Sequence, residues 1–168
     1  MPNWCEGELR VRGPLQNLLN FFQYGLRLTD HTGWSRPFKL FPVRIDTSCF
    51  GPDDEIYISI RDTCWVKGSS RAFVDNDEIT IYKHKTDPET EQDIYYVTIP
   101  TIRQAWSFEA DTYLELARTF GVDIKLWGSM CFQEFEQEIV IEKGELVRNE
   151  EHEYDDWVWE SRFPTNGY

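Results

Sequence analysis

The chain has 168 residues, enough for one domain with a substantial core, and it carries 30 acidic against 17 basic residues, a formal net charge of −13. Its 7 Trp, 8 Tyr and 11 Phe residues exclude a disordered chain despite this charge. The acidity disfavours nucleic-acid binding by the surface as a whole, and no apolar run approaches the roughly 20 residues that a membrane helix needs.

The first predicted unit is a strand followed by a helix. Residues 5–12 alternate in polarity, with Leu9 and Val11 on the side that is predicted to face the core. Gly13-Pro14 then ends the strand, and proline suits the first position of a helix. An apolar stripe marks that helix: Leu15, Leu18, Leu19, Phe22 and Leu26.

The middle of the chain is predicted to contain several strands. Residues 29–54 hold many turn-forming residues and form a long connection, with a short strand expected over 38–45. A strand follows over 55–61. Residues 79–83 and 94–99 have the pattern of a hairpin with an acidic tip, and we assign 75–100 to this insertion.

A helix, a strand, a turn and a second strand are predicted over residues 106–147. Ser107 is placed to cap the helix, and Gly121 is placed to end it in a left-handed conformation. Alternation with a period of two then begins, and it stops at Gly128-Ser129, where a turn is expected. In the next strand, apolar and acidic residues alternate: Phe135, Ile139 and Ile141 against Glu134, Glu136 and Glu138.

This order of elements predicts an α+β fold. We expect a ferredoxin-like β-α-β-β-α-β core with an antiparallel sheet, two helices on one face and the inserted β-hairpin. Residues 1–168 are expected to form a single domain. Its appendages are the long connection at 29–54, the hairpin at 75–100 and an acidic aromatic tail at 148–168.

Four segments resemble one known family. They are Met1-Pro2-Asn3-Trp4-Cys5, Lys67-Gly68-Ser69-Ser70-Arg71-Ala72-Phe73, the helix near Trp106 with the strands after it, and Asp155-Asp156-Trp157-Val158-Trp159-Glu160. In these segments the chain resembles the YubB-like ferredoxin-domain proteins, which are small, largely uncharacterised proteins of phages and plasmids. The resemblance implies a fold and a mobile-element origin, and it implies no activity.

Acidic residues concentrate near the C-terminus, where residues 134–160 hold eleven acids against Lys143 and Arg148. Such a density predicts a surface that attracts a basic protein. The three glutamates of the strand that begins near residue 134 are expected to be exposed and to serve binding rather than folding. The predicted partner-binding acids are Glu134, Glu136, Glu138, Glu150, Glu151, Glu153, Asp155 and Asp156.

One stretch resembles an anion-binding turn: Lys67, Gly68, Ser69, Ser70 and Arg71. Glycine allows a positive φ, and consecutive amides beside hydroxyl and basic groups can form an anion-binding nest. The stretch lacks the full phosphate-loop signature, so a plain turn is the main alternative. If the nest does form, the chain would be a small nucleotide-binding protein.

A further alternative is an RRM-like module that binds single-stranded nucleic acid. Its sheet would present Tyr57, Tyr82, Tyr95 and Tyr96 for stacking against bases. The sequence contains no RNP-type motif, and the net acidity opposes this interpretation.

The sequence indicates no metal centre, cofactor or catalytic residue. His31, His84 and His152 are scattered, and the acids around His152 have the pattern of solvated charge. Cys5 lies on the inward side of its predicted strand, so we expect a buried thiol rather than a nucleophile. The four cysteines form no C-x-x-C pair and the start of the chain has no signal-peptide pattern, which favours a reducing cytosol.

Together these patterns predict a non-enzymatic accessory protein of a phage or other mobile element that acts in the host cytosol. It would bind a basic protein partner through its acidic surface, and a nucleic-acid-binding host protein is one such partner. The expected role is that of a counter-defence inhibitor, anti-CRISPR-like or a mimic of nucleic acid. Neither membrane association nor direct nucleic-acid binding is expected.

Overall fold

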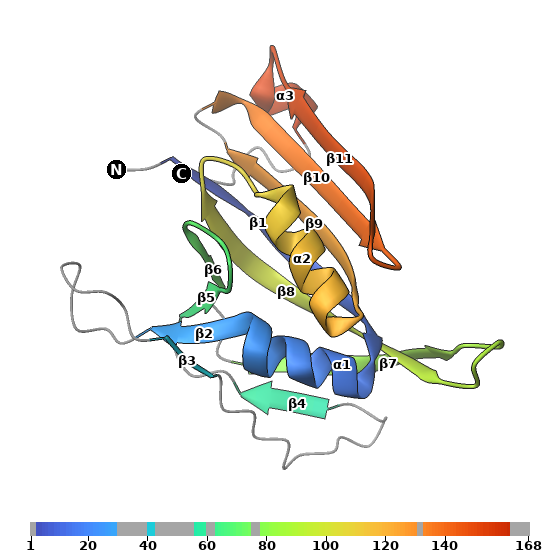
Figure 1. Cartoon of the computed structure of the whole chain (residues 1–168). Coiled ribbons are helices and arrows are strands. Elements are labelled where there is room, and N and C mark those ends of the chain that lie inside the picture. Colours follow the sequence, from blue (N-terminus) through green and yellow to red (C-terminus); the bar gives the residue numbers. More distant parts are fainter. Residues whose placement is uncertain are drawn as a thin grey trace.

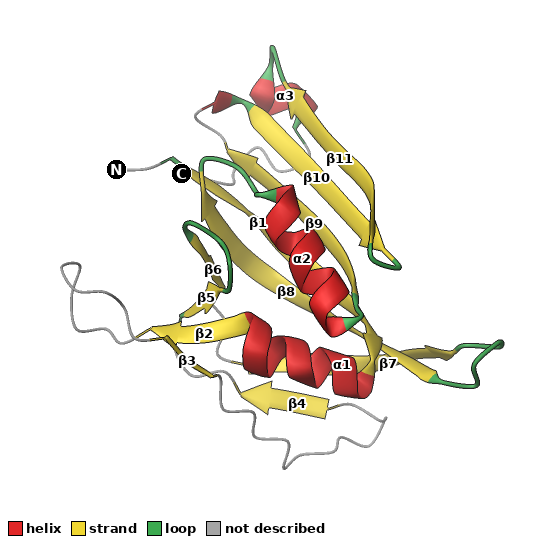
Figure 2. Cartoon of the chain, viewed as in Figure 1, coloured by secondary structure: helices red, strands yellow, loops and turns green. Residues whose placement is uncertain are grey.

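The computed structural model describes residues 3–29, 40–42, 56–59, 63–74, 78–130 and 133–161, and these form one large antiparallel sheet with short helices (Figures 1 and 2). The strand order is β11-β10-β9-β1-β8-β6-β5-β2-β3, and β7 pairs with both β4 and β8 beside this path. The strands are β1 (Trp4–Pro14), β2 (Leu26–Thr29), β3 (Leu40–Pro42), β4 (Ile56–Ser59), β5 (Cys64–Val66), β6 (Ala72–Val74), β7 (Glu78–Thr86), β8 (Asp93–Ala105), β9 (Asp123–Met130), β10 (Phe135–Glu142) and β11 (Glu145–Glu153). The helices are α1 (Leu15–Asn20), the π-helical turn η1 (Phe21–Gly25), α2 (Ala110–Phe120) and α3 (Trp157–Glu160).

The predicted fold class is wrong. Over the described ranges the chain is a mostly antiparallel β protein with an 11-stranded sheet, and it is not a small ferredoxin-like α+β core. On one side the sheet continues beyond β8 through β6, β5, β2 and β3, and on the other it continues beyond β9 through β10 and β11. The first four of these strands have only 3 or 4 residues each, too few for a period of two to be recognised in the sequence.

Strand β1 lies in the middle of the sheet, between β8 and β9. Leu9 and Val11 are fully buried, so the prediction that this strand is central and that these residues belong to the core is confirmed. Gly7 is required for the close packing of β1 on β9. A Cβ atom at this position would lie 1.8 Å from the backbone oxygen of Trp127.

Helices α1 and α2 lie on the same face of the sheet, which we call the helical face (Figure 1). Phe21 and Phe22 from η1 and Tyr113 from α2 are fully buried against the sheet. Gly121 ends α2 with φ of 62° and ψ of 45°, so the predicted left-handed stop is confirmed. The predicted cap is wrong, because α2 begins after Glu109 rather than after Ser107.

Two segments predicted to be irregular are strands. Gly128 and Ser129 do not form a turn but continue β9 to Met130. The ring of Phe108 occupies the space beside Gly128, 2.1 Å from where a Cβ atom would be, so this glycine serves packing rather than a turn. The start of the predicted tail is β11, which pairs with β10 across a turn at Lys143 and Gly144.

The other predicted segments are placed as follows. The hairpin expected within 75–100 consists of β7 and β8, and β8 extends to Ala105 beside β1. Of the long connection at 29–54, only Thr29 and β3 lie within the described residues. Within the described ranges, no helix has both the length and the apolar character needed to cross a bilayer.

Candidate functional site

Glu136, predicted to be an exposed binding residue, is buried, with 5% of its surface accessible. Its two carboxylate oxygens accept hydrogen bonds from the hydroxyl of Tyr154 at 2.8 Å and from the hydroxyl of Ser161 at 2.6 Å. These partners lie before and after α3. The expected exposure of Glu136 is therefore wrong, and this side chain ties the C-terminal segment to the sheet.

Glu138 is held by two ion pairs within the protein. Its carboxylate lies 2.9 Å from Lys125 Nζ and 2.7 Å from Arg148 Nη1. The hydrogen bond from Lys125 comes first among the causes that hold the pKa of Glu138 below its ordinary value, and the bond from Arg148 adds to it. Glu134 is exposed in the turn before β10, with φ of 51°. The three glutamates thus differ in exposure and do not form a uniform acidic row.

The exposed acids gather on β11, at the end of the sheet. All nine residues of β11 are exposed, and among the described strands β11 pairs only with β10. Glu150, Glu151 and Glu153 lie on this edge strand, and Asp155 is exposed just after it. Asp156 accepts a hydrogen bond from the backbone N–H of Trp159 and thereby caps α3.

The two tryptophans of helix α3 lie in different surroundings. Trp157 is buried at 3% exposure and meets the ring of Tyr154 edge-on at 5.7 Å between centroids. Trp159 is 86% exposed and Val158 is 73% exposed. We name the exposed face of β11 and α3, with its glutamates and these two apolar residues, the β11–α3 surface. The sequence alone does not show that Trp159 points outward, because both tryptophans carry the same local pattern.

An acidic hollow of about 290 Å³ lies beside this surface. It is lined by Trp127, Glu136, Gln137, Glu138, Glu150, His152 and Tyr154. Its carboxylates have partners within the protein. Glu136 accepts hydrogen bonds from Tyr154 and Ser161. Glu138 pairs with Lys125 and Arg148, and Glu150 lies 3.7 Å from Arg148 Nε.

The predicted anion-binding turn is occupied by a carboxylate of the chain itself. The backbone N–H of Ser70 donates to Glu109 at 3.3 Å, and the hydroxyl of Ser70 also donates to Glu109. Partial burial raises the pKa of Glu109, but the hydrogen bonds from Ser70 outweigh this effect and hold the pKa below its ordinary value. Gly68 has the expected positive φ of 87°, while Lys67 and Arg71 are exposed. The turn therefore fixes the start of α2.

Three of the four tyrosines predicted for stacking share the face opposite the helices. Tyr82 and Tyr96 are cross-strand partners stacked at 5.5 Å, and Tyr57 lies on the neighbouring strand β4. Successive residues of a strand point to opposite faces, so Tyr95, next to Tyr96, lies on the helical face, where it packs against the core. The cations of β1 on the same face have acidic partners, since Arg10 pairs with Glu8 and Arg12 with Asp123 and Glu142.

Within the described residues, no group of three or more His, Cys, Asp or Glu side chains is arranged to hold a metal ion. Cys5 and Cys64 are buried and form no disulfide. Burial raises the pKa of the Cys5 thiol far above its ordinary value, which keeps it protonated and unreactive. Cys49, Cys131 and His31 lie outside the described residues.

Comparison of the chain with protein-family models, with curated proteins and with solved structures gives no match. The geometry therefore defines the protein only as an acidic, mostly antiparallel β protein with a charged edge strand and an exposed tryptophan.

Proposed function

We propose that this chain is a non-enzymatic protein that binds a basic protein partner through the β11–α3 surface. The observation that carries the proposal is Trp159, which is 86% exposed on a helix whose other tryptophan is buried. Leaving an indole ring in water forgoes roughly 25 cal/mol for each Å² of apolar surface. Tryptophan is also among the residues that most often dominate the energy of protein interfaces.

The anchoring of α3 supports this role. Glu136 holds both flanks of the helix, and Asp156 caps it, so the backbone that carries Trp159 is held in place before a partner arrives. A segment whose backbone is already ordered loses less conformational freedom on binding. The glutamates of β11 surround it with negative charge that speeds encounter with a cationic surface.

The proposed setting is the one that the sequence suggests, the cytosol of a host cell that carries a phage or another mobile element. A nucleic-acid-binding host protein would present the required cationic surface, and blocking it would make the chain a counter-defence inhibitor. Support for this class of partner comes from the net charge of −13 and from the acids exposed along β11.

The proposal is tested by affinity capture from host lysate followed by binding measurements on each basic protein recovered. Glu150→Gln/Glu151→Gln/Glu153→Gln should weaken binding most at low salt, because salt screens exposed charges. Trp159→Ala should weaken it at every salt concentration. The matched control is Glu91→Gln/Asp111→Asn/Glu115→Gln, which removes the same charge from exposed positions outside the β11–α3 surface. Equal binding by all four proteins would refute the proposal.

A second candidate function rests on the Tyr82–Tyr96 stack. Aromatic rings on an accessible sheet face can stack with the bases of single-stranded nucleic acid. Titration of fluorescently labelled single-stranded RNA and DNA with wild type and with Tyr96→Ala tests it. Binding that falls in the variant would support this candidate, and absence of binding by wild type at low salt would remove it.

A further inference from the structure

A second possible anion site is a cleft of about 810 Å³ whose lining does not include the predicted anion-binding turn. Basic side chains from four separate elements line this cleft. Arg12 comes from β1, Lys85 from β7, Arg118 from α2 and Lys143 from the turn between β10 and β11. Pro14, Pro88, Ile94, Ala117 and Val122 supply an apolar part of the wall. We call it the basic cleft. Its volume is within the range of small-molecule sites.

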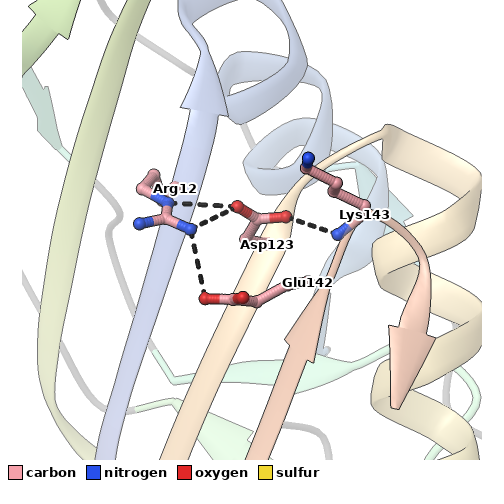
Figure 3. Close-up of polar contacts among 4 residues, drawn as sticks. All are labelled: Arg12, Asp123, Glu142 and Lys143. Atoms are coloured by element: carbon pink, nitrogen blue, oxygen red, sulfur yellow. Dashed lines mark hydrogen bonds and ion pairs between the residues drawn. The ribbon is translucent and has the colours of Figure 1, made fainter. Parts of the chain in front are cut away.

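The carboxylates in the basic cleft are largely engaged. Asp123 accepts hydrogen bonds from Arg12 Nη2 at 2.7 Å and from the backbone N–H of Lys143 at 2.8 Å (Figure 3). Asp87 accepts from the backbone N–H groups of Glu89 and Thr90 at 2.8 and 3.2 Å. Four cations and three acids line the cleft, so its formal charge is 4 − 3 = +1, whereas the chain carries −13.

Three of the cations are available to a ligand. Lys85, Arg118 and Lys143 are exposed, and no carboxylate among the described residues forms an ion pair with them. Arg118 donates from Nε to the carbonyl oxygen of Gly144 at 2.7 Å, which fixes its guanidinium at the wall. It also lies in the last turn of α2, where its charge offsets the negative end of the helix dipole.

Lys143 occupies an unfavourable backbone conformation. Its φ is 51°, in the left-handed region that glycine, asparagine and aspartate adopt far more readily than lysine. The turn would form with any of those residues, so its backbone does not require lysine. The contact with Asp123 that Figure 3 shows is made by the backbone N–H of Lys143 and not by its side-chain amine.

We propose that the basic cleft binds a phosphate-bearing small molecule of nucleotide size. Lys85, Arg118 and Lys143 would contact the phosphate, because they are the unpaired cations of the cleft. Glu89 also lines the cleft and could accept hydrogen bonds from hydroxyl or amino groups of the ligand. This site is separate from the β11–α3 surface, so its test and the test of the proposed function are independent.

The probes are the four ribonucleoside 5′-monophosphates, the four matching nucleosides and inorganic phosphate, each titrated into the full chain. Binding is followed by calorimetry and by the amide resonances of Asp123, Lys143 and Gly144, with Ser70 as a distant reference. We expect at least one monophosphate to shift the three cleft amides and to bind more tightly than its nucleoside. Stronger binding of a monophosphate than of inorganic phosphate would identify the nucleotide as the source of the phosphate.

The decisive variants are Lys143→Asn and Lys85→Gln. Asparagine tolerates the left-handed conformation, so the first variant removes the amine while the turn is retained. Each should weaken binding of the monophosphate roughly tenfold, and the matched control Lys125→Gln, which alters a lysine paired with Glu138, should leave it within about twofold. Absence of shifts at the cleft amides with every phosphate probe at about 5 mM, or equal affinity in all variants, would overturn the proposal.

Discussion

Glu136 shows how the setting of one carboxylate differs from that of its neighbours in sequence. Replacing it with alanine would remove the carboxylate that accepts hydrogen bonds from the partly buried hydroxyl of Tyr154 and the buried hydroxyl of Ser161. We expect Glu136→Ala to lower the free energy of unfolding by about 1–3 kcal/mol in urea titrations. Glu151→Ala, at an exposed position on the neighbouring strand, is the control and should change it by less than about 0.5 kcal/mol. A Glu136→Ala protein as stable as wild type would contradict the role of this side chain as an anchor.

Glu138 should make stability depend on pH. Its hydrogen bonds from Lys125 and Arg148 hold its pKa in the folded protein below the ordinary value of 4.5. A carboxyl whose pKa is lowered by folding stabilises the protein above its unfolded pKa, and this contribution is lost as the pH falls through its folded pKa. Stability measured by urea titration should therefore decrease below about pH 4.5, and less steeply in Glu138→Gln. Parallel curves for the two proteins would exclude Glu138 as a source of this dependence.

At the scale of elements, β1 is the strand whose loss should be most damaging. Leu9→Ala removes a fully buried side chain and should lower the free energy of unfolding by about 2–5 kcal/mol. Gly7→Ala should cost more, because the added methyl group would overlap the backbone of β9. Chemical denaturation of both variants measures the two losses. A Leu9→Ala loss below about 0.5 kcal/mol would show that the centre of the core lies elsewhere.

The elements that sequence patterns predicted correctly are those with strong local signals. The alternation in β1 and the glycine stop of α2 depend on residues within a few positions of each other. Strand β11 lacks such a signal, because all nine residues are exposed and its pairing depends on β10. Gly128 resembles a turn glycine, but the ring beside it comes from Phe108, which is distant in sequence. Contacts of this kind decide whether an ambiguous segment becomes strand or turn.

The same distinction applies to the candidate site. The acidity of residues 134–160 is a matter of composition and was evident in the sequence. The burial of Glu136 and the engagement of Ser70 by Glu109 depend on partners up to 39 positions away. The basic cleft joins four elements that no local pattern relates. Composition thus predicted which charges the protein has, while the fold determines which of them remain exposed and able to contact a partner or ligand.

At the scale of the whole molecule, the two tryptophans of the C-terminal segment have different roles: one is buried against the body and the other is exposed. Trp157 packs on the body, so Trp157→Ala should lower the free energy of unfolding by about 3–5 kcal/mol and release α3. Trp159→Ala should leave stability within about 0.5 kcal/mol of wild type, because the ring is exposed, and should instead reduce partner binding. Thermal and urea unfolding, together with the binding assay, separate these effects. Equal destabilisation by the two substitutions would mean that Trp159 also belongs to the folded body, and the β11–α3 surface would lose its apolar anchor.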